Sequence, residues 1–376
     1  MGMKLTVVMP GAAGREGGTR LCRIASGVME GLPLDGALQE TAKGFTVEWV
    51  RDVEGFFSRF CSKGFQNARI LFLFDIGATG ICMELYSMLW MIRQVEGGFD
   101  GSIAGLVVDG EGELYTKAVA REFVFSANRS GCLFVGRPLA EATKGLANFS
   151  VAARVRGISP EEAYKEAIRE LALRVACFSA APKRNPKLLC LHSCNTRVSN
   201  TYMLWSMVKK HLGGCCRIQE IFFRNGEIKD CLGCSYDTCL TYGQNTQCYY
   251  GGVIVDGVYP ALESCDGLML LCPNYNDALG ANLTAFINRM TALYRKRQFY
   301  EKYLFSVIVS GYSGGDIVAA QLIDAVCMNK TFILPPYFAL TAVANEPGSV
   351  GKAENVGQRA RKYAGGIARV LCGDRF

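Results

Sequence analysis

The stretch DGLMLLCPNYNDALGANLTAFINRM, residues 266–290, decides the fold of this chain. It predicts a short, continuously apolar strand, a loop punctuated by Pro and Gly, and then a helix. The stretch ARILFLFDIGATGICMELYSMLWMI, residues 68–92, has the same parts in the same order and lies over it without a gap. We therefore predict that the chain contains one α/β unit twice.

The repeat extends to both sides of this pair of stretches. The strand KLTVVM (4–9), with its Gly-rich turn and helix, matches the strand LLCL (188–191), the turn HSCNTRVSNT and the helix YMLWSMVKKHL. Residues 102–136 lie over residues 304–335, and each stretch predicts a strand, a loop, a helix and a further strand. An offset of 182 pairs Gly11 with Ser193, Arg15 with Arg197, and Thr19 with Thr201, while residues 45–50 and 217–223 supply the second strands.

Each half thus has the element order βαβαβαβαβ. Its strands are uniformly apolar, which is typical of parallel strands covered on both faces, and right-handed crossovers place helices on both sides. Since neither half has a sixth strand, a flavodoxin-like order 2-1-3-4-5 is favoured over a dinucleotide-binding Rossmann order. The prediction is an α/β chain of two tandem, doubly wound, five-stranded parallel sheets.

The two halves are joined by a predicted helical linker. We expect a first domain over 1–150, the linker over 151–186 and a second domain over 187–376. A helix begins after Ser159, because a Ser cap, Pro160 and two acidic residues form a typical helix start, and it runs to about Ala176.

Composition narrows the class of protein. The chain has 376 residues, 50% of them hydrophobic, which suits two domains with real cores. Its net charge of +7 is spread along the chain, with no long basic tract, so we expect no nucleic-acid partner. No apolar run reaches membrane-spanning length and the first residues do not form a secretory signal, which predicts a cytoplasmic protein without a membrane partner. Without that signal, the 17 cysteines indicate reduced thiols, metal ligation or redox chemistry.

Ligands of doubly wound sheets bind at the carboxyl ends of the strands, and this rule selects three loops of the second half. The first follows the strand at 188–191 and opens a helix, so its hydroxyls, amides and helix N-terminus suit a phosphate. An ordinary polar helix cap is the alternative for this loop. Its candidate residues are Ser193, Asn195, Arg197, Ser199, Asn200 and Thr201.

The other two loops follow the third and fourth strands of the second half. One offers a rigid Pro-containing turn with an aromatic face, and the other offers glycines that allow a ligand to approach the backbone closely. Ordinary turns are again the alternative for each loop alone, whereas three such loops at one sheet edge favour a ligand. The candidates are Pro273, Asn274, Tyr275, Asn276 and Asp277, and Gly311, Tyr312, Gly314 and Gly315.

These loops carry a resemblance to a known family. The stretches HSCNTRVSNT, CPNYNDALGANLTAFINRM and VSGYSGGD, within 187–345, resemble the NAD(P)H-dependent FMN reductase and iron–sulfur flavoprotein branch of the flavodoxin-like superfamily. The resemblance implies that the first loop holds the FMN phosphate, that 273–276 contacts the isoalloxazine ring, and that 311–315 closes over its pyrimidine side. The usual family loop starts Gly-Ser-Pro-Arg, whereas this one starts His192-Ser193-Cys194-Asn195.

The resemblance also implies an activity. It predicts an FMN-dependent oxidoreductase that passes reducing equivalents from NAD(P)H to a small-molecule or protein acceptor, with a homodimer as the expected assembly. The alternative is an FMN and iron–sulfur electron carrier that serves a protein partner without binding a nicotinamide, and a third, weaker interpretation is a sensor or structural protein. No side chain is needed as an obligatory acid or base, so no catalytic residue is assigned. His192, at a strand end beside the first loop, is a candidate ligand contact.

A cluster of cysteines lies between the second and third strands of the second half. Cys231, Cys234, Cys239 and Cys248 have the spacing C-x2-C-x4-C-x8-C. Thiolates suit iron–sulfur and zinc sites, and iron–sulfur flavoproteins have a compact cluster at this place. Four interpretations stay open: a [4Fe–4S] cluster, unligated thiols, a zinc site, and a redox-active Cys231/Cys234 pair.

The first half lacks these features. Its ring loop, residues 75–80, has neither the Pro nor the aromatic residue, and no cysteine cluster follows its second strand. Its third loop, residues 109–113, is acidic, which disfavours an anion there. We therefore interpret the first half as a degenerate copy that supports the second.

Overall fold

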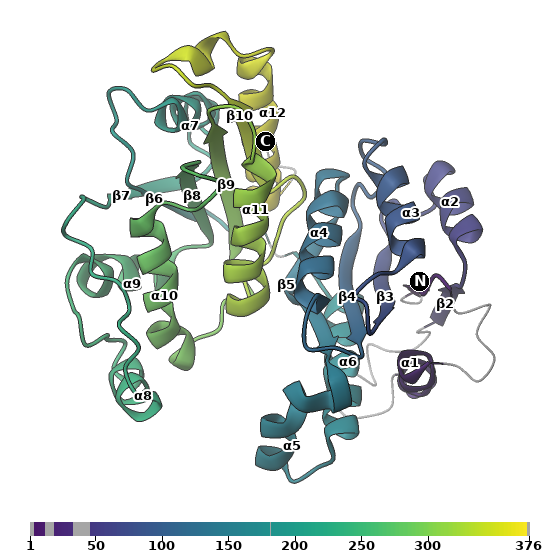
Figure 1. Ribbon diagram of the computed structural model, residues 1–376. Helices are drawn as coiled ribbons and strands as arrows, with labels where there is room; N and C mark the ends of the chain where they lie inside the picture. Colours follow the sequence, from purple (N-terminus) through teal and green to yellow (C-terminus); the bar gives the residue numbers. More distant parts are fainter. Residues whose placement is uncertain (1–3, 12–18, 33–45, 181, 374–376) are drawn as a thin grey trace. The chain divides into compact units, whose positions relative to one another are not determined.

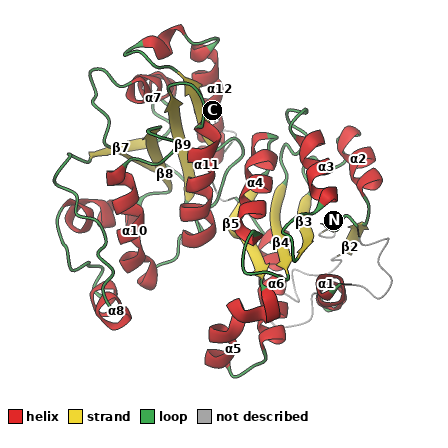
Figure 2. Ribbon diagram, in the orientation of Figure 1, coloured by secondary structure: helices red, strands yellow, loops and turns green. Residues whose placement is uncertain are grey.

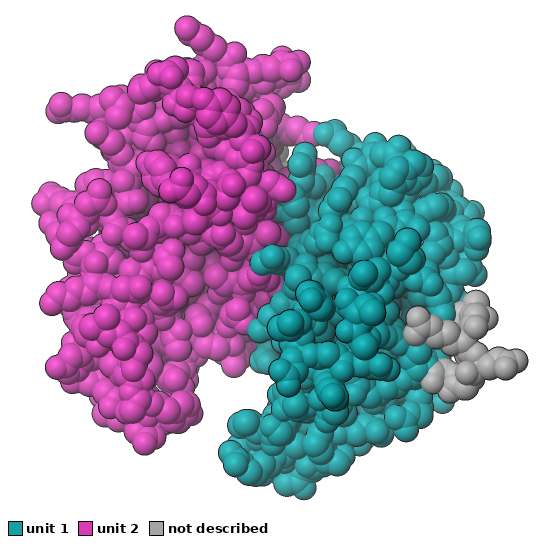
Figure 3. Space-filling model, in the orientation of Figure 1, with its two compact units in different colours: residues 1–179 teal, residues 180–376 magenta. Residues whose placement is uncertain are grey.

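The computed structural model describes residues 4–11, 19–32, 46–180 and 182–373. The chain divides into two compact units, Met1–Ser179 and Ala180–Phe376 (Figure 3). Each unit is a five-stranded parallel sheet with helices on both faces (Figures 1 and 2). Within the described ranges, the helices are too short or too polar to cross a membrane.

Unit 1 has the strand order β2-β1-β3-β4-β5, the predicted flavodoxin-like order. Its strands are β1 (Lys4–Val8), β2 (Thr46–Val50), β3 (Arg69–Gly77), β4 (Ile103–Gly110) and β5 (Leu133–Ala142). Its helices are α1 (Arg20–Glu30), α2 (Val53–Cys61), α3 (Met83–Ile92), α4 (Thr116–Arg129), the 3-10 segment η3 (Lys144–Phe149), α5 (Ser150–Arg156) and α6 (Pro160–Ala176).

Unit 2 has the equivalent order β7-β6-β8-β9-β10, so the fold prediction is confirmed in both halves. Its strands are β6 (Lys187–His192), β7 (Arg217–Phe222), β8 (Gly267–Pro273), β9 (Tyr303–Ser310) and β10 (Ala339–Val343). Its helices are α7 (Asn200–His211), α8 (Tyr236–Gln244), η4 (Ile254–Val258), α9 (Tyr259–Ser264), α10 (Ala281–Lys296), α11 (Gly315–Leu322), η5 (Ile323–Met328), η6 (Ser349–Lys352) and α12 (Val356–Cys372).

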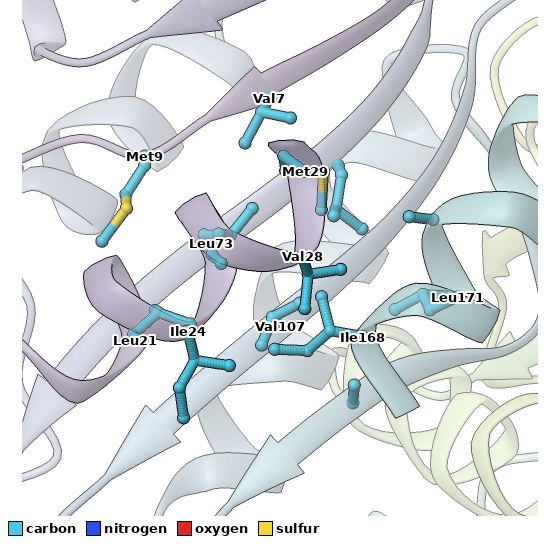
Figure 4. Packing of buried hydrophobic residues seen from close by; sticks show 14 of the residues in the cluster. Val7, Met9, Leu21, Ile24, Val28, Met29, Leu73, Val107, Ile168 and Leu171 are labelled. Carbon is cyan, nitrogen blue, oxygen red and sulfur yellow. The ribbon is translucent and has the colours of Figure 1, made fainter. Parts of the chain in front are cut away.

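Helices α1 and α6 cover one face of the unit 1 sheet. Their apolar side chains pack on those of β1, β3 and β4, as Figure 4 shows for Val28, Ile168 and Leu73. Helix α6 begins as predicted, because the Ser159 side chain accepts a hydrogen bond from the Glu162 N–H. Although the sequence predicts a linker over 151–186, this helix is a layer of unit 1, and the division between the units falls after Ser179.

The edge strands β5 and β10 carry the clearest trace of the repeat. Ile103 pairs with Leu133 and Leu106 with Leu139, and at positions numbered 200 higher Tyr303 pairs with Ile333 and Ser306 with Ala339. Both edges therefore contain the same bulge. At its centre Arg137 (φ 52°) and Tyr337 (φ 55°) share a left-handed conformation, which is unusual for residues other than glycine.

Because of this bulge, the last strand of unit 2 begins later in the sequence than predicted. The alignment with residues 304–335 predicts the fifth strand of the second half at the end of that stretch. There Ile333 makes only an isolated bridge, and β10 begins at Ala339. Pro335 and Pro336 lie between them, and proline cannot donate a hydrogen bond to a strand ladder.

Candidate functional site

The candidate site lies at the carboxyl ends of the strands of unit 2, where Asn274 joins two of the predicted loops. Its side-chain N–H group donates to Ser310 Oγ, at the end of β9, at 3.1 Å, and to the Ser313 carbonyl, in the loop that follows, at 3.0 Å. It also lies 3.1 Å from Asp277 Oδ1 in its own loop. The Asn274 side-chain oxygen, in contrast, is buried and has no partner, which leaves a hydrogen-bond acceptor for a ligand.

Gly314 allows the two loops to approach each other. It has a φ of +83°, and a Cβ built on it would lie 1.8 Å from Asp277 Oδ1 and 2.8 Å from Asn274 Nδ2. Glycine is favoured here, because a side chain would be strained at this φ and would displace the Asp277 carboxylate and the Asn274 amide from their contacts. Gly315 begins α11 with ordinary space around it, since its nearest neighbour would be Ser310 Oγ at 3.5 Å.

Two further side chains fix the loops and were not predicted from the sequence. Gln321 in α11 clamps the second loop, since its amide N–H donates to the Asp277 carbonyl at 3.0 Å and its oxygen accepts from the Leu279 N–H at 3.0 Å. Asn345, after β10, donates to Tyr312 Oη at 3.2 Å. Asn276 and Asp277 have positive φ angles, the kind of conformation that Asn and Asp tolerate in turns.

The predicted phosphate loop is a tight turn that opens helix α7. Ser199 caps the helix and accepts a hydrogen bond from the Tyr202 N–H at 3.3 Å, while Asn195 Oδ1 accepts from the Arg197 N–H at 3.0 Å. The Arg197 side chain is exposed, and Thr201 is buried. Ser193, which is half-buried, directly follows β6.

Asn200 has a structural contact within the protein. Its amide N–H group donates to the carbonyls of Ala344 at 3.2 Å and Glu346 at 2.8 Å, and its oxygen accepts from the Val350 N–H at 3.2 Å. These bonds tie the phosphate loop to the segment that follows β10. The side chain of Asn200 therefore positions the loop, and the backbone amides at the start of α7 face outward as in other helix N-termini.

Exposed apolar residues occur along this edge of the sheet. Large hydrophobic residues are exposed at or within two residues of the carboxyl ends of β7, β8, β9 and β10, and Val198 is exposed in the loop six residues after β6, with exposed fractions from 45% to 80%. Exposed apolar side chains gathered at one place are typical of binding sites. The residues of the apolar rim are Val198, Phe222, Tyr275, Tyr312 and Val343.

His192 ends β6 beneath the phosphate loop. Its ring is buried between those of Tyr202 and Phe222, with centroids 5.2 and 5.4 Å away, and its Nδ1 atom has no partner. Burial lowers the pKa of His192, against the opposing charge of Glu220. The carboxylate of Glu220 accepts hydrogen bonds from Lys209 Nζ at 2.9 Å and Trp205 Nε1 at 3.0 Å.

The structure does not bring the four predicted cysteine ligands into one set. Cys231 and Cys234 precede α8, Cys239 lies within it, and Cys248 follows it. Cys239 Sγ accepts a hydrogen bond from Arg295 Nε at 3.4 Å, and Cys234 Sγ lies 3.9 Å from Tyr250 Oη. Among the residues whose placement is described, no three His, Cys, Asp or Glu side chains are grouped as metal ligands.

Among the described residues, the equivalent edge of unit 1 contains an internal ion pair. Arg20, at the start of α1, pairs with both carboxylate oxygens of Asp109 and donates to the carbonyls of Gly110 and Thr143, each at 3.2 Å. Its hydrogen bond to Asp109 raises the pKa of Arg20. Tyr115, just before α4, has a left-handed backbone conformation, as Gly314 has just before α11. The side-chain ring of Tyr115 lies against Gly80. The predicted counterpart Arg15 is outside the described residues.

Comparison with known proteins supports the predicted resemblance. Residues 186–345 match the family model of NADPH-dependent FMN reductase, which confirms it for the second half. No curated protein matches the chain.

Several solved structures are similar at low identity. RosB with the bound intermediate 8-demethyl-8-formylriboflavin-5'-phosphate is 13% identical over 49% of this chain and 78% of that one, with a TM-score of 0.40. The NAD(P)H:quinone oxidoreductase from Methanothermobacter marburgensis is 10% identical over 49% and 98%, with a TM-score of 0.37. An FMN-dependent NADH-azoreductase from Bacillus anthracis str. Ames Ancestor, in complex with FMN, is 11% identical over 50% and 99%, with a TM-score of 0.33.

Replacing Gly314 tests the closed arrangement of the two loops. We expect Gly314→Ala to lower the free energy of unfolding by about 1–3 kcal/mol, because the new Cβ has both a strained φ and a collision with Asp277. The matched control Gly315→Ala is expected to change it by less than about 1 kcal/mol. Urea unfolding of both variants measures the difference, and equal effects would contradict the close approach.

The buried imidazole of His192 predicts a pH dependence of stability. Its pKa in the folded chain lies below the ordinary value of 6.5, so the unfolded chain takes up the proton first as the pH falls. Stability is therefore expected to decrease below pH 6.5, by at most about 1.4 kcal/mol per pH unit from this group. Thermal unfolding of wild type and His192→Phe between pH 7.5 and 5.5 measures it, and the same slope in both proteins would exclude His192 as the cause.

Proposed function

Because residues 186–345 match the NADPH-dependent FMN reductase family, we propose that unit 2 binds FMN at the carboxyl edge of its sheet and passes reducing equivalents from NAD(P)H to an acceptor. The observation that carries the proposal is the combination found at this edge. A helix N-terminus that suits a phosphate lies beside an apolar rim that suits a flat aromatic ring system.

The residues present fit the parts of FMN. The loop 193–201 would hold the phosphate, through backbone N–H groups at the start of α7 and the charge of Arg197. The loops 273–277 and 311–315 would contact the ring. The unpartnered oxygen of Asn274 suits the N–H group on the polar side of a flavin ring, because a buried acceptor without a donor is otherwise unfavourable.

In this proposal the protein binds and orients the flavin, and the flavin carries out the redox chemistry. When bound, FMN supplies hydride and one-electron transfer. The Asn274 contacts and the Gln321 clamp hold the two ring loops in one arrangement before any ligand arrives, which reduces the entropy lost on binding. The exposed rings of Tyr275 and Tyr312 would offer apolar surface to a planar acceptor.

The four cysteines of the loop 231–248 take no part in the proposed reaction. As placed, they form no ligand set, so the electron-carrier alternative requires a rearrangement of this loop that brings the thiols together. The acceptor class stays as the sequence predicts it, a small molecule or a protein, and a homodimer stays the expected assembly.

Reduction by a nicotinamide distinguishes the proposed enzyme from the electron carrier. We expect NADPH or NADH to bleach the visible absorbance of the FMN-loaded protein under anaerobic conditions, and to do so much faster than it bleaches free FMN at the same concentration. The free flavin is the control, since it shares the chemistry and lacks the protein's orientation. FMN-loaded protein that neither nicotinamide bleaches would contradict the reductase, and counted iron and sulfide would then favour the carrier.

A further inference from the structure

Two cysteines far apart in the sequence meet on the side of unit 2 away from the candidate site. Cys372 is the last residue of α12, and Cys215 lies in the turn between α7 and β7. Their sulfur atoms are 3.2 Å apart, and Cys372 Sγ also donates to the Cys215 carbonyl at 3.0 Å. Both residues are buried, with exposed fractions of 4% and 5%.

Other buried thiols in unit 2 have different surroundings. Cys265 Sγ donates to the Leu262 carbonyl at 3.3 Å, and Cys272 Sγ lies 3.7 Å from Ser306 Oγ. These contacts pair sulfur with oxygen, as expected of cysteines that act as small core residues. In the contact between Cys215 and Cys372, sulfur faces sulfur instead, about 1.2 Å beyond the length of a disulfide bond.

A covalent bond between these two residues would have a large effect on the stability of unit 2. The two residues are 157 positions apart, so a bond between them would close a loop containing β7, β8, β9 and β10. Helix α12 already packs on the sheet, because Tyr363 Oη donates to the Phe338 carbonyl at 2.6 Å and accepts from the Ser306 N–H at 3.0 Å. The end of this helix accepts a hydrogen bond from the Lys183 N–H at the Leu371 carbonyl, at 2.9 Å, and a bond at Cys372 would add a covalent link to the turn before β7.

We propose that Cys215 and Cys372 are a reversible thiol–disulfide pair that fastens the end of α12 to the turn before β7. The oxidant is a low-molecular-weight disulfide. One cysteine attacks it as the thiolate, forms a mixed disulfide and releases one small thiol. The second cysteine then displaces the other small thiol. One sulfur–sulfur bond breaks and one forms, two electrons pass from the protein sulfurs to the reagent, and both protons end on the two released thiols.

The surroundings of the two thiols determine how fast the disulfide bond between them forms. Burial raises the pKa of Cys372 to about 12, and it also raises the pKa of Cys215. Since the thiolate is the attacking form, oxidation is slow at neutral pH, and its rate is expected to rise roughly ten-fold per pH unit between pH 7 and 9. The pair is therefore expected to close slowly at neutral pH, even when the small disulfide is in excess.

Oxidation of the full chain by glutathione disulfide tests the proposal. After free thiols are alkylated and the protein is digested, mass spectrometry should identify a Cys215–Cys372 cross-linked peptide that a dithiol reductant removes. Oxidation should raise the Tm of unit 2 by roughly 5–15 °C, because the closed loop is long. Recovery of Cys215 and Cys372 as alkylated thiols, or joined to other cysteines, would overturn the proposal.

Two variants assign the Tm shift. Cys372→Ser should abolish it, while Cys216→Ser, which removes the adjacent thiol, should keep it. The Tm of each reduced variant shows whether the variant folds. A full Tm shift in Cys372→Ser would overturn the proposal, and so would its loss in a folded Cys216→Ser.

Discussion

The Asn274 side chain is the constraint on which the candidate site depends. Its amide N–H group joins the end of β8 to the residues after β9, and its backbone N–H donates to the Val309 carbonyl at 2.8 Å. The close approach of the loops follows from these bonds and requires Gly314. The remaining oxygen of Asn274 is left as a buried acceptor without a partner, so the residue that joins the two loops also carries the atom to which we assign a flavin contact.

The two units have the same fold but different contacts at the carboxyl edges of their sheets. Their edge strands keep the same register and the same bulge at positions 200 residues apart. In unit 1, however, the Arg20 guanidinium occupies the strand ends and is paired with Asp109. A cation already neutralised inside the protein offers little to a phosphate, which supports the interpretation of unit 1 as a degenerate copy.

Most of the fold was predictable from the sequence, because buried parallel strands have a recognisable, uniformly apolar sequence. Uniformly apolar stretches such as 267–272 and the capped start of α6 at Ser159 fixed the elements and their order. The local sequence pattern does not show which distant residues are in contact, so the hydrogen bonds of Gln321 and Asn345 were not predicted. The apolar residues at the ends of β7 and β10, in contrast, could have indicated the apolar rim. The bulge before Ala339 was missed since its register depends on pairing with β9. Residues 231–248 show the same limit, because spacing alone does not determine where thiols lie.

The number of FMN molecules bound per chain distinguishes unit 2 from unit 1. In a calorimetric titration of the flavin-free full chain, we expect one FMN per chain, because the family match lies within unit 2, whereas Arg20 at the edge of unit 1 is paired with Asp109. Two FMN molecules per chain would contradict the asymmetry between the units, and no binding would contradict the flavin site itself.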